Sequence, residues 1–223
     1  MSVALGSSAA VLYSQPHNGT GTINLSSWVF ENGSDADMYA YDSFIIPTGG
    51  AVERVTWRGG YQYNAMYGSV NNFSIYFYES TAGGTEPHVN NPQLPEFYLA
   101  RYLLNGIAGE TPAGTFGGKA MYDYAYDLPT PFNADAGVKY WIRIEGFQPV
   151  YPDWGLASGS GGNGNHFAFS TGAAMFNFYP NDLAFTLEGT PVPEPAAALV
   201  VAAGIGALAA GGMVRRRWAS RSF

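Results

Sequence analysis

Three histidines and a set of acidic side chains are the residues of this 223-residue chain whose types suit catalysis or metal binding. His17, His88 and His166 lie far apart, and none belongs to an H-x-x-x-H or H-E-x-x-H pattern that would place two zinc ligands on one helix face. The chain has no cysteine, which excludes thiolate metal sites and cysteine nucleophiles. Ser160 lies in a glycine run without the strand-turn-helix sequence of a nucleophile elbow. We therefore predict that the protein is not an enzyme and has no cofactor.

The carboxylates leave two alternatives open. A glycosidase needs two Asp or Glu side chains about 5 to 9.5 Å apart across a cleft, and a chain with this many acids contains such pairs by chance. Asp35, Asp37 and Asp42 cluster near an asparagine and could offer oxygen ligands to Ca²⁺. So could Asp123 and Asp127, on one side of an expected strand. We interpret these acids as solvated loop charge, with a calcium site at Asp35, Asp37 and Asp42 as the alternative.

Aromatic residues make up 16% of the chain, and flat rings with polar edges can stack on sugars. Trp57 and Trp141 lie in the middle of expected strands, which predicts that they belong to the core. Trp154 is flanked by proline and aspartate on one side and glycine on the other, which predicts a loop. We therefore select Trp154, with the nearby Tyr151, as possible glycan contacts.

The elements that must position these residues are short β-strands. Apolar and polar residues alternate between clusters of Gly, Pro and Asn, as is typical of antiparallel strands. Nine strands are predicted, over residues 38–46, 52–58, 73–78, 97–104, 121–128, 138–145, 166–169, 175–179 and 182–188. Because the connections are loops without helical periodicity, we predict an all-β fold.

The expected architecture is a single antiparallel β-sandwich, jelly-roll-like, over residues 20–189. Residues 1–19 are assigned to an N-terminal segment outside it, either an ordinary frayed terminus or the remnant of a truncated signal peptide.

The composition changes abruptly after residue 189. Residues 190–195 are a Pro-rich link, which the prolines keep extended. The link ends in the four residues Val192, Pro193, Glu194 and Pro195. Residues 196–214 carry no charge, a stretch long enough for one transmembrane helix. The alternative is an apolar helix that packs on the core of a soluble protein.

A basic tail, residues 215–223, follows this stretch and begins with Arg215, Arg216 and Arg217. Arginine resists transfer across the bilayer, so the positive-inside rule keeps this end in the cytoplasm and places the β-domain outside. We predict that the three arginines are the stop-transfer signal of an exported domain.

The order of Pro-Glu-Pro motif, uncharged helix and arginine cluster resembles the PEP-CTERM sorting signal of Gram-negative bacteria that produce exopolysaccharide. The resemblance covers residues 192–223. It implies that an exosortase, a membrane-embedded processing enzyme, recognises the tail and that this chain is its substrate. The segments 41–47, 52–61, 137–144 and 182–189 resemble strands of PEP-CTERM passenger domains more loosely, which implies a compartment and a fold rather than a reaction.

The excess of acidic over basic side chains indicates which partners the β-domain can bind. Residues 1–190 hold six basic and sixteen acidic side chains, so this part repels phosphate backbones and nucleic acid is not expected to bind. We expect a structural or adhesive component of an exopolysaccharide matrix, in the cell envelope or outside the cell, anchored transiently in the inner membrane. A carbohydrate-binding module is the alternative, and a secreted glycan-active hydrolase is a further one.

Overall fold

The structure is a computed structural model that describes residues 9–29, 37–81, 83–89, 97–171 and 175–192. These residues belong to a compact unit that ends at Pro191, with Val192 beyond it. The fold is all-β, and within the described ranges there is no α-helix and hence no helix that could span a membrane. The predicted transmembrane helix at 196–214 and the basic tail at 215–223 lie outside the described residues.

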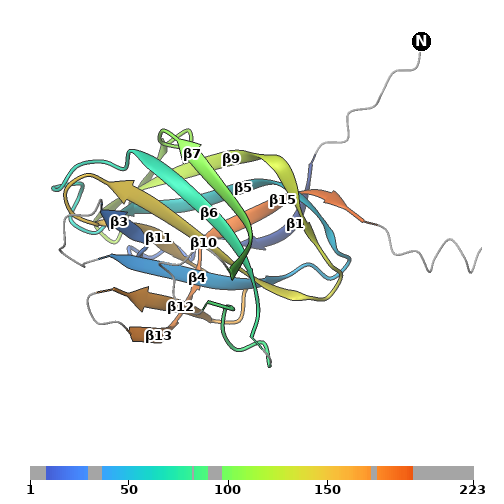
Figure 1. The fold of residues 1–223 in the computed structure, drawn as a ribbon. Helices are drawn as coiled ribbons and strands as arrows, with labels where there is room; N and C mark the ends of the chain where they lie inside the picture. The colour runs from blue at the N-terminus through green and yellow to red at the C-terminus, as the bar shows by residue number, and fades with distance from the viewer. Residues whose placement is uncertain (1–8, 30–36, 82, 90–96, 172–174, 193–223) are drawn as a thin grey trace, which may run out of the picture. The chain divides into compact units, whose positions relative to one another are not determined.

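Two sheets form a sandwich-like fold (Figure 1). The eight-stranded sheet consists of β1 (Ala10–Gln15), β2 (Ile23–Leu25), β5 (Gly50–Tyr61), β8 (Thr111–Phe116), β9 (Lys119–Ala134), β11 (Trp154–Gly159), β14 (Asp182–Leu183) and β15 (Phe185–Pro191). The seven-stranded sheet consists of β3 (Ser27–Val29), β4 (Met38–Ile45), β6 (Asn72–Glu79), β7 (Tyr98–Asn105), β10 (Lys139–Gln148), β12 (Asn165–Ser170) and β13 (Met175–Pro180).

Strand order within each sheet departs from chain order. The path of the first sheet runs β1-β15-β5-β11-β14, with β9 pairing β5 and β8, and that of the second runs β13-β12-β4-β3-β10-β6-β7. The described strands pair antiparallel, with the single exception of β3 and β10, which run parallel from Ser27 to Val29. The prediction of a purely antiparallel sandwich is wrong for this pair.

The body of the sandwich extends beyond the predicted limits. Residues 10–15 were assigned to the N-terminal segment, but they form β1 and pair with β15. Thr190 and Pro191, assigned to the link, are the last residues of β15 and pair with Ala51 and Gly50. Strand pairing therefore makes residues 10–15 and 190–191 part of the sandwich.

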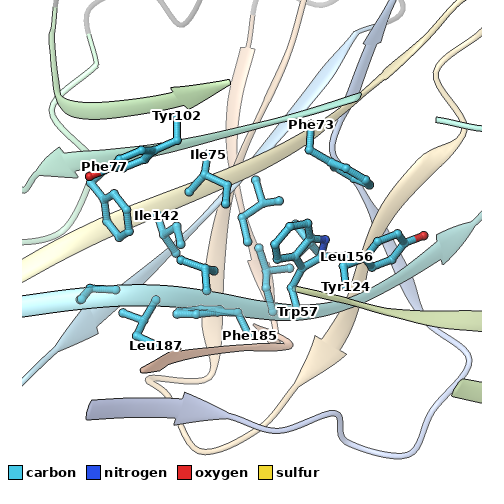
Figure 2. Packing of buried hydrophobic residues seen from close by; sticks show 14 of the residues in the cluster. Trp57, Phe73, Ile75, Phe77, Tyr102, Tyr124, Ile142, Leu156, Phe185 and Leu187 are labelled. Atoms are coloured by element: carbon cyan, nitrogen blue, oxygen red, sulfur yellow. The ribbon is translucent and has the colours of Figure 1, made fainter. Parts of the chain in front are cut away.

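Alternation along each strand builds the core between the sheets. Phe73, Ile75 and Phe77 of β6 point to this core, where they meet Trp57 of β5 and Phe185 of β15 (Figure 2). Face-to-face and edge-to-face rings carry much of the packing, because aromatic side chains bury large areas. Trp57 is only 3% exposed, which confirms its predicted position in the core.

The opposite face of the seven-stranded sheet carries a second buried cluster, the outer aromatic layer, which comprises Tyr39, Tyr41, Tyr76, Tyr78, Trp141, Phe167 and Phe169. Trp141 is buried as predicted, but in this layer rather than between the sheets. Arg143 lies in the same layer, with its guanidinium carbon 4.0 Å from the Tyr76 ring centroid and its Nε 3.1 Å from a Glu145 carboxylate oxygen. Ring faces and a paired carboxylate together compensate the burial of this cation.

Candidate functional site

Trp154, selected from the sequence as an exposed residue, is buried. Its side chain is 0% exposed, and it is the first residue of β11 rather than part of a loop. The indole packs edge-on against Phe73, with ring centroids 4.8 Å apart, and its Nε1 donates to the Tyr124 hydroxyl at 3.1 Å. The prediction that Trp154 meets a sugar at the surface is therefore wrong.

Two glycines, one from each sheet, make room for this indole. A methyl group on Gly59 of β5 would lie 2.6 Å from the Trp154 ring and 2.6 Å from the Gly155 carbonyl oxygen. A methyl group on Gly146 of β10 would lie 3.1 Å from the same ring. A methyl group at 2.6 Å would overlap the ring, and one at 3.1 Å would force the ring to shift by a few tenths of an ångström, so both glycines leave room for the buried tryptophan.

Tyr151 remains accessible, and the structure gives it two aromatic neighbours that the sequence analysis had not grouped with it. The Tyr151 and Tyr67 ring centroids lie 4.8 Å apart, and those of Tyr67 and Tyr63 lie 6.0 Å apart. Tyr151 is 37% exposed and Tyr63 is 46% exposed. We call Tyr63, Tyr67 and Tyr151 the tyrosine cluster. It joins the loop between β5 and β6 to the loop between β10 and β11.

Gln148, which is fully buried, ties these two loops together. Its Oε1 accepts hydrogen bonds from the backbone N–H groups of Asp153 and Trp154, at 2.7 and 2.8 Å. Its Nε2 donates to the Gly68 carbonyl oxygen at 2.8 Å. One amide thus holds both loops, and the tyrosine rings are positioned before any ligand binds.

Asp153 adds a second tie between the same loops. Its Oδ1 accepts from the Tyr63 N–H at 3.3 Å, and its carbonyl oxygen accepts from the Gln62 N–H at 2.8 Å. Sequence reasoning missed both Gln148 and Asp153, since a buried polar residue at a strand end looks like any other loop residue.

A cavity of about 240 Å³ shares Tyr63 with the tyrosine cluster. We call it the histidine cavity, and its lining residues are Ile23, Asn24, Leu25, Met38, Gln62, Tyr63, His166, Ala168 and Tyr179. His166 is 2% exposed and stacks on Tyr179, with ring centroids 5.4 Å apart. Burial lowers the pKa of His166 from its usual value, although the Asn181 carbonyl and the Asp182 carboxylate act in the opposite direction. The ring is therefore neutral at pH 7.

Two larger cavities are lined by charged side chains. One, of about 550 Å³, includes Arg58 and Asp123, which form a two-point ion pair with N···O distances of 2.7 and 2.9 Å. The other, of about 770 Å³, includes Glu79, Arg101 and Asp135.

Of the acids considered for catalysis or calcium, those that the structure describes bind groups of the fold, and the interpretation as solvated loop charge is wrong for Asp42 of β4. Asp42 is fully buried, and its two carboxylate oxygens accept from the Ser43 and Leu183 N–H groups at 2.7 and 2.6 Å. Burial raises the pKa of Asp42 well above its usual value. Asp37 accepts from the Val29 N–H at 3.0 Å, and Asp35 lies outside the described residues.

Asp123 and Asp127, the other two acids considered for calcium, form ion pairs with arginines. Asp127 pairs with Arg54, as Asp123 does with Arg58. Among the residues that the structure describes, no group of three or more His, Asp or Glu side chains could hold a metal ion.

The sorting motif is described only at Val192, which is exposed beyond the end of β15. Pro193, Glu194 and Pro195, together with Arg215, Arg216 and Arg217, lie outside the described residues.

Comparison with known proteins gives one result. The family described as Domain of unknown function (DUF7901) matches residues 13–188. No curated protein and no solved structure matches the chain.

Proposed function

The chain belongs to the family described as Domain of unknown function (DUF7901), and we propose that it is an exported protein whose β-sandwich adheres to extracellular polysaccharide. In this proposal it is a structural or adhesive component of an exopolysaccharide matrix rather than a catalyst. The observation that carries the proposal is the exposed tyrosine cluster on two loops held by a single buried glutamine.

Tyrosine rings suit this role because each offers an apolar face to the C–H groups of a sugar ring and a hydroxyl to its oxygens. Exposed rings fixed by the backbone lose little conformational entropy on binding, which favours a preformed site. Asp42 binds two backbone amides and Glu145 pairs with Arg143, so neither of these buried carboxylates supports the hydrolase alternative.

Export is the second part of the proposal and rests on the sequence. Val192, Pro193, Glu194 and Pro195 would form the motif read by an exosortase, and residues 196–214 would be the helix that holds the chain in the inner membrane until processing. We also propose that the two sheets are a jelly-roll-like variant of the sandwich. No nucleic acid and no cofactor are part of this function.

Polysaccharide binding by the purified full chain, in a detergent without a sugar headgroup, tests the proposal. A glycan array of neutral polysaccharides is the probe. Tyr151→Ala removes one ring of the cluster and is expected to weaken binding about tenfold, equivalent to roughly 1.4 kcal/mol. Phe178→Ala is the control, because it removes a ring that is 51% exposed on β13 and outside the cluster.

The proposal is contradicted if the chain binds no glycan of the array. It is also contradicted if Tyr151→Ala binds as tightly as the unmodified chain.

A further inference from the structure

The histidine cavity differs in charge from the two larger cavities. None of its nine lining residues is Asp, Glu, Lys or Arg, whereas each larger cavity has charged side chains in its wall. Four lining residues are aliphatic or thioether side chains: Ile23, Leu25, Met38 and Ala168. A ligand of this cavity must therefore be uncharged and carry an apolar group, because an unpaired charge would lose its hydration without compensation.

The polar groups of the wall can be assigned donor and acceptor roles. Nδ1 of His166 lies 2.9 Å from the Asn181 carbonyl oxygen, which can only accept, so Nδ1 carries the proton. In the neutral ring Nε2 is then an acceptor, and it has no hydrogen-bond partner within the described part of the chain. A hydroxyl or amide N–H of a ligand can donate to it.

The Gln62 side-chain amide is a second such group. It makes no hydrogen bond to any residue that the structure describes, although the backbone of Gln62 is fixed by Asp153 and Lys119. An amide offers both a donor and an acceptor, which matches the amide of an acetamido substituent.

We propose that the histidine cavity binds one uncharged sugar residue bearing an acetamido group, as a subsite beside the tyrosine cluster. The inference rests on the proposed function and names the sugar class that it selects. A volume of about 240 Å³ is below the roughly 300–1,000 Å³ of sites for drug-sized ligands, so a single sugar ring fits the size. The apolar side chains receive the acetamido methyl group, Tyr63 and Tyr179 contact the ring, and Nε2 of His166 accepts from a sugar donor.

Titration calorimetry of the full chain, in the same sugar-free detergent, tests this inference with three probes. The methyl glycoside of N-acetylglucosamine is expected to bind at least tenfold more tightly than methyl glucoside, which lacks the acetamido group. Glucuronic acid is expected not to bind, because its carboxylate would be desolvated without a partner.

His166→Asn is the decisive variant. The asparagine amide can occupy the place of Nδ1–H and keep the hydrogen bond to the Asn181 carbonyl, but it lacks the acceptor at Nε2. Binding of the N-acetyl sugar is expected to weaken about tenfold, as for the loss of one hydrogen bond. His88→Asn is the matched control, since His88 lies outside the lining of the three cavities described above.

Tyr179→Leu is the second variant, for the case in which the buried His166 tolerates no change. Tyr179 is 40% exposed, so its replacement preserves the fold while removing a ring from the cavity wall, and it is expected to lower the affinity about tenfold as well. The thermal unfolding midpoint of each variant shows whether it is folded.

The outcomes separate this inference from the proposed function. Suppose that Tyr151→Ala weakens polysaccharide binding. If the unmodified chain then does not bind N-acetylglucosamine, or if folded His166→Asn or Tyr179→Leu binds it as tightly as the unmodified chain does, the proposed subsite is overturned and the proposed glycan adhesion stands. If N-acetylglucosamine binds with the expected variant pattern while Tyr151→Ala has no effect on polysaccharide binding, the cavity is upheld and the role of the tyrosine cluster is overturned.

Discussion

Gln148 determines more of the candidate site than any tyrosine does. It is fully buried, and the two ends of its amide satisfy three backbone groups in two loops. A backbone group left without a partner in the interior costs about 1–3 kcal/mol, so this side chain, together with the Asp153 contacts, fixes the conformation of the loops.

Gln148→Met is expected to destabilise the protein by about 2–4 kcal/mol, because the side chain keeps its length but leaves three backbone groups unsatisfied. Chemical denaturation measures the change, and glycan binding is expected to fall with it as the two loops separate. Asn133→Met is the control, since Asn133 is exposed on β9, and it is expected to change stability by less than about 0.5 kcal/mol. Equal effects of the two substitutions would show that Gln148 does not fix the loops.

Residue-level sequence reasoning succeeded for Trp57 and failed for Trp154 for a physical reason. Trp57 lies in an alternating run, and alternation reports directly which face of a strand is buried. Trp154 follows Pro152 and Asp153, which are typical loop residues, but its burial depends on glycines at positions 59 and 146 that are distant in sequence. The cavity at His166 was not predictable for the same reason, because its walls come from five separate segments.

At the level of elements, strands rich in aromatic and aliphatic residues were predicted well, and several short or glycine-containing strands were missed. The expected ranges of β4, β6 and β10 agree with the structure within a few residues, although both faces of these strands are buried. β11 was missed because its six residues include two glycines and a serine and lead into a glycine run, so that its sequence resembles a turn. β8 was missed because its sequence contains proline and glycine and most of its residues are exposed.

Gly59→Ala tests how far the sandwich depends on strand glycines. The added methyl group would lie 2.6 Å from both the Gly155 carbonyl oxygen and the Trp154 ring, so β5 and β11 must separate. Overpacking of this kind is expected to lower the free energy of unfolding by about 1–3 kcal/mol, measured by denaturant titration, and to change the near-ultraviolet circular dichroism of the tryptophans.

Thr56→Ser in the same strand is the control, because its half-buried side chain lies outside the core, and it is expected to cost at most about 0.5 kcal/mol. If Gly59→Ala is as stable as Thr56→Ser, Trp154 does not require the space above Gly59.

At the scale of the whole molecule, the chain divides at Pro191 into the β-unit and a terminal unit of different composition. The β-unit holds sixteen of the seventeen acidic residues and the tyrosine cluster, and the arginine cluster belongs to the terminal unit. If the tail is removed as proposed, every strand that the structure describes stays in the β-unit.

The three arginines are therefore expected to set membrane orientation without contributing to the β-fold. Each arginine costs about 2.5–3.5 kcal/mol at the centre of a membrane helix, so Arg215, Arg216 and Arg217 form a strong barrier to translocation. The stretch before them is rich in alanine and glycine and gives little insertion free energy, which makes retention depend on the arginines more than it would after a leucine-rich helix.

Replacing all three arginines with glutamine is expected to release the chain, unprocessed, into the medium. Intact mass is the measurement: the unmodified chain recovered from the envelope of cells with an exosortase should end near Pro193-Glu194-Pro195, and the released variant should still end at Phe223. The variant should keep the β-type circular dichroism spectrum of the unmodified chain, because the substituted residues lie outside the β-unit.

If the variant is processed and localised like the unmodified chain, the arginines are not the retention signal, and recognition must rest on the Pro-Glu-Pro motif and the apolar stretch. If the unmodified chain also ends at Phe223, the tail is a permanent anchor, and exosortase processing is not part of its function.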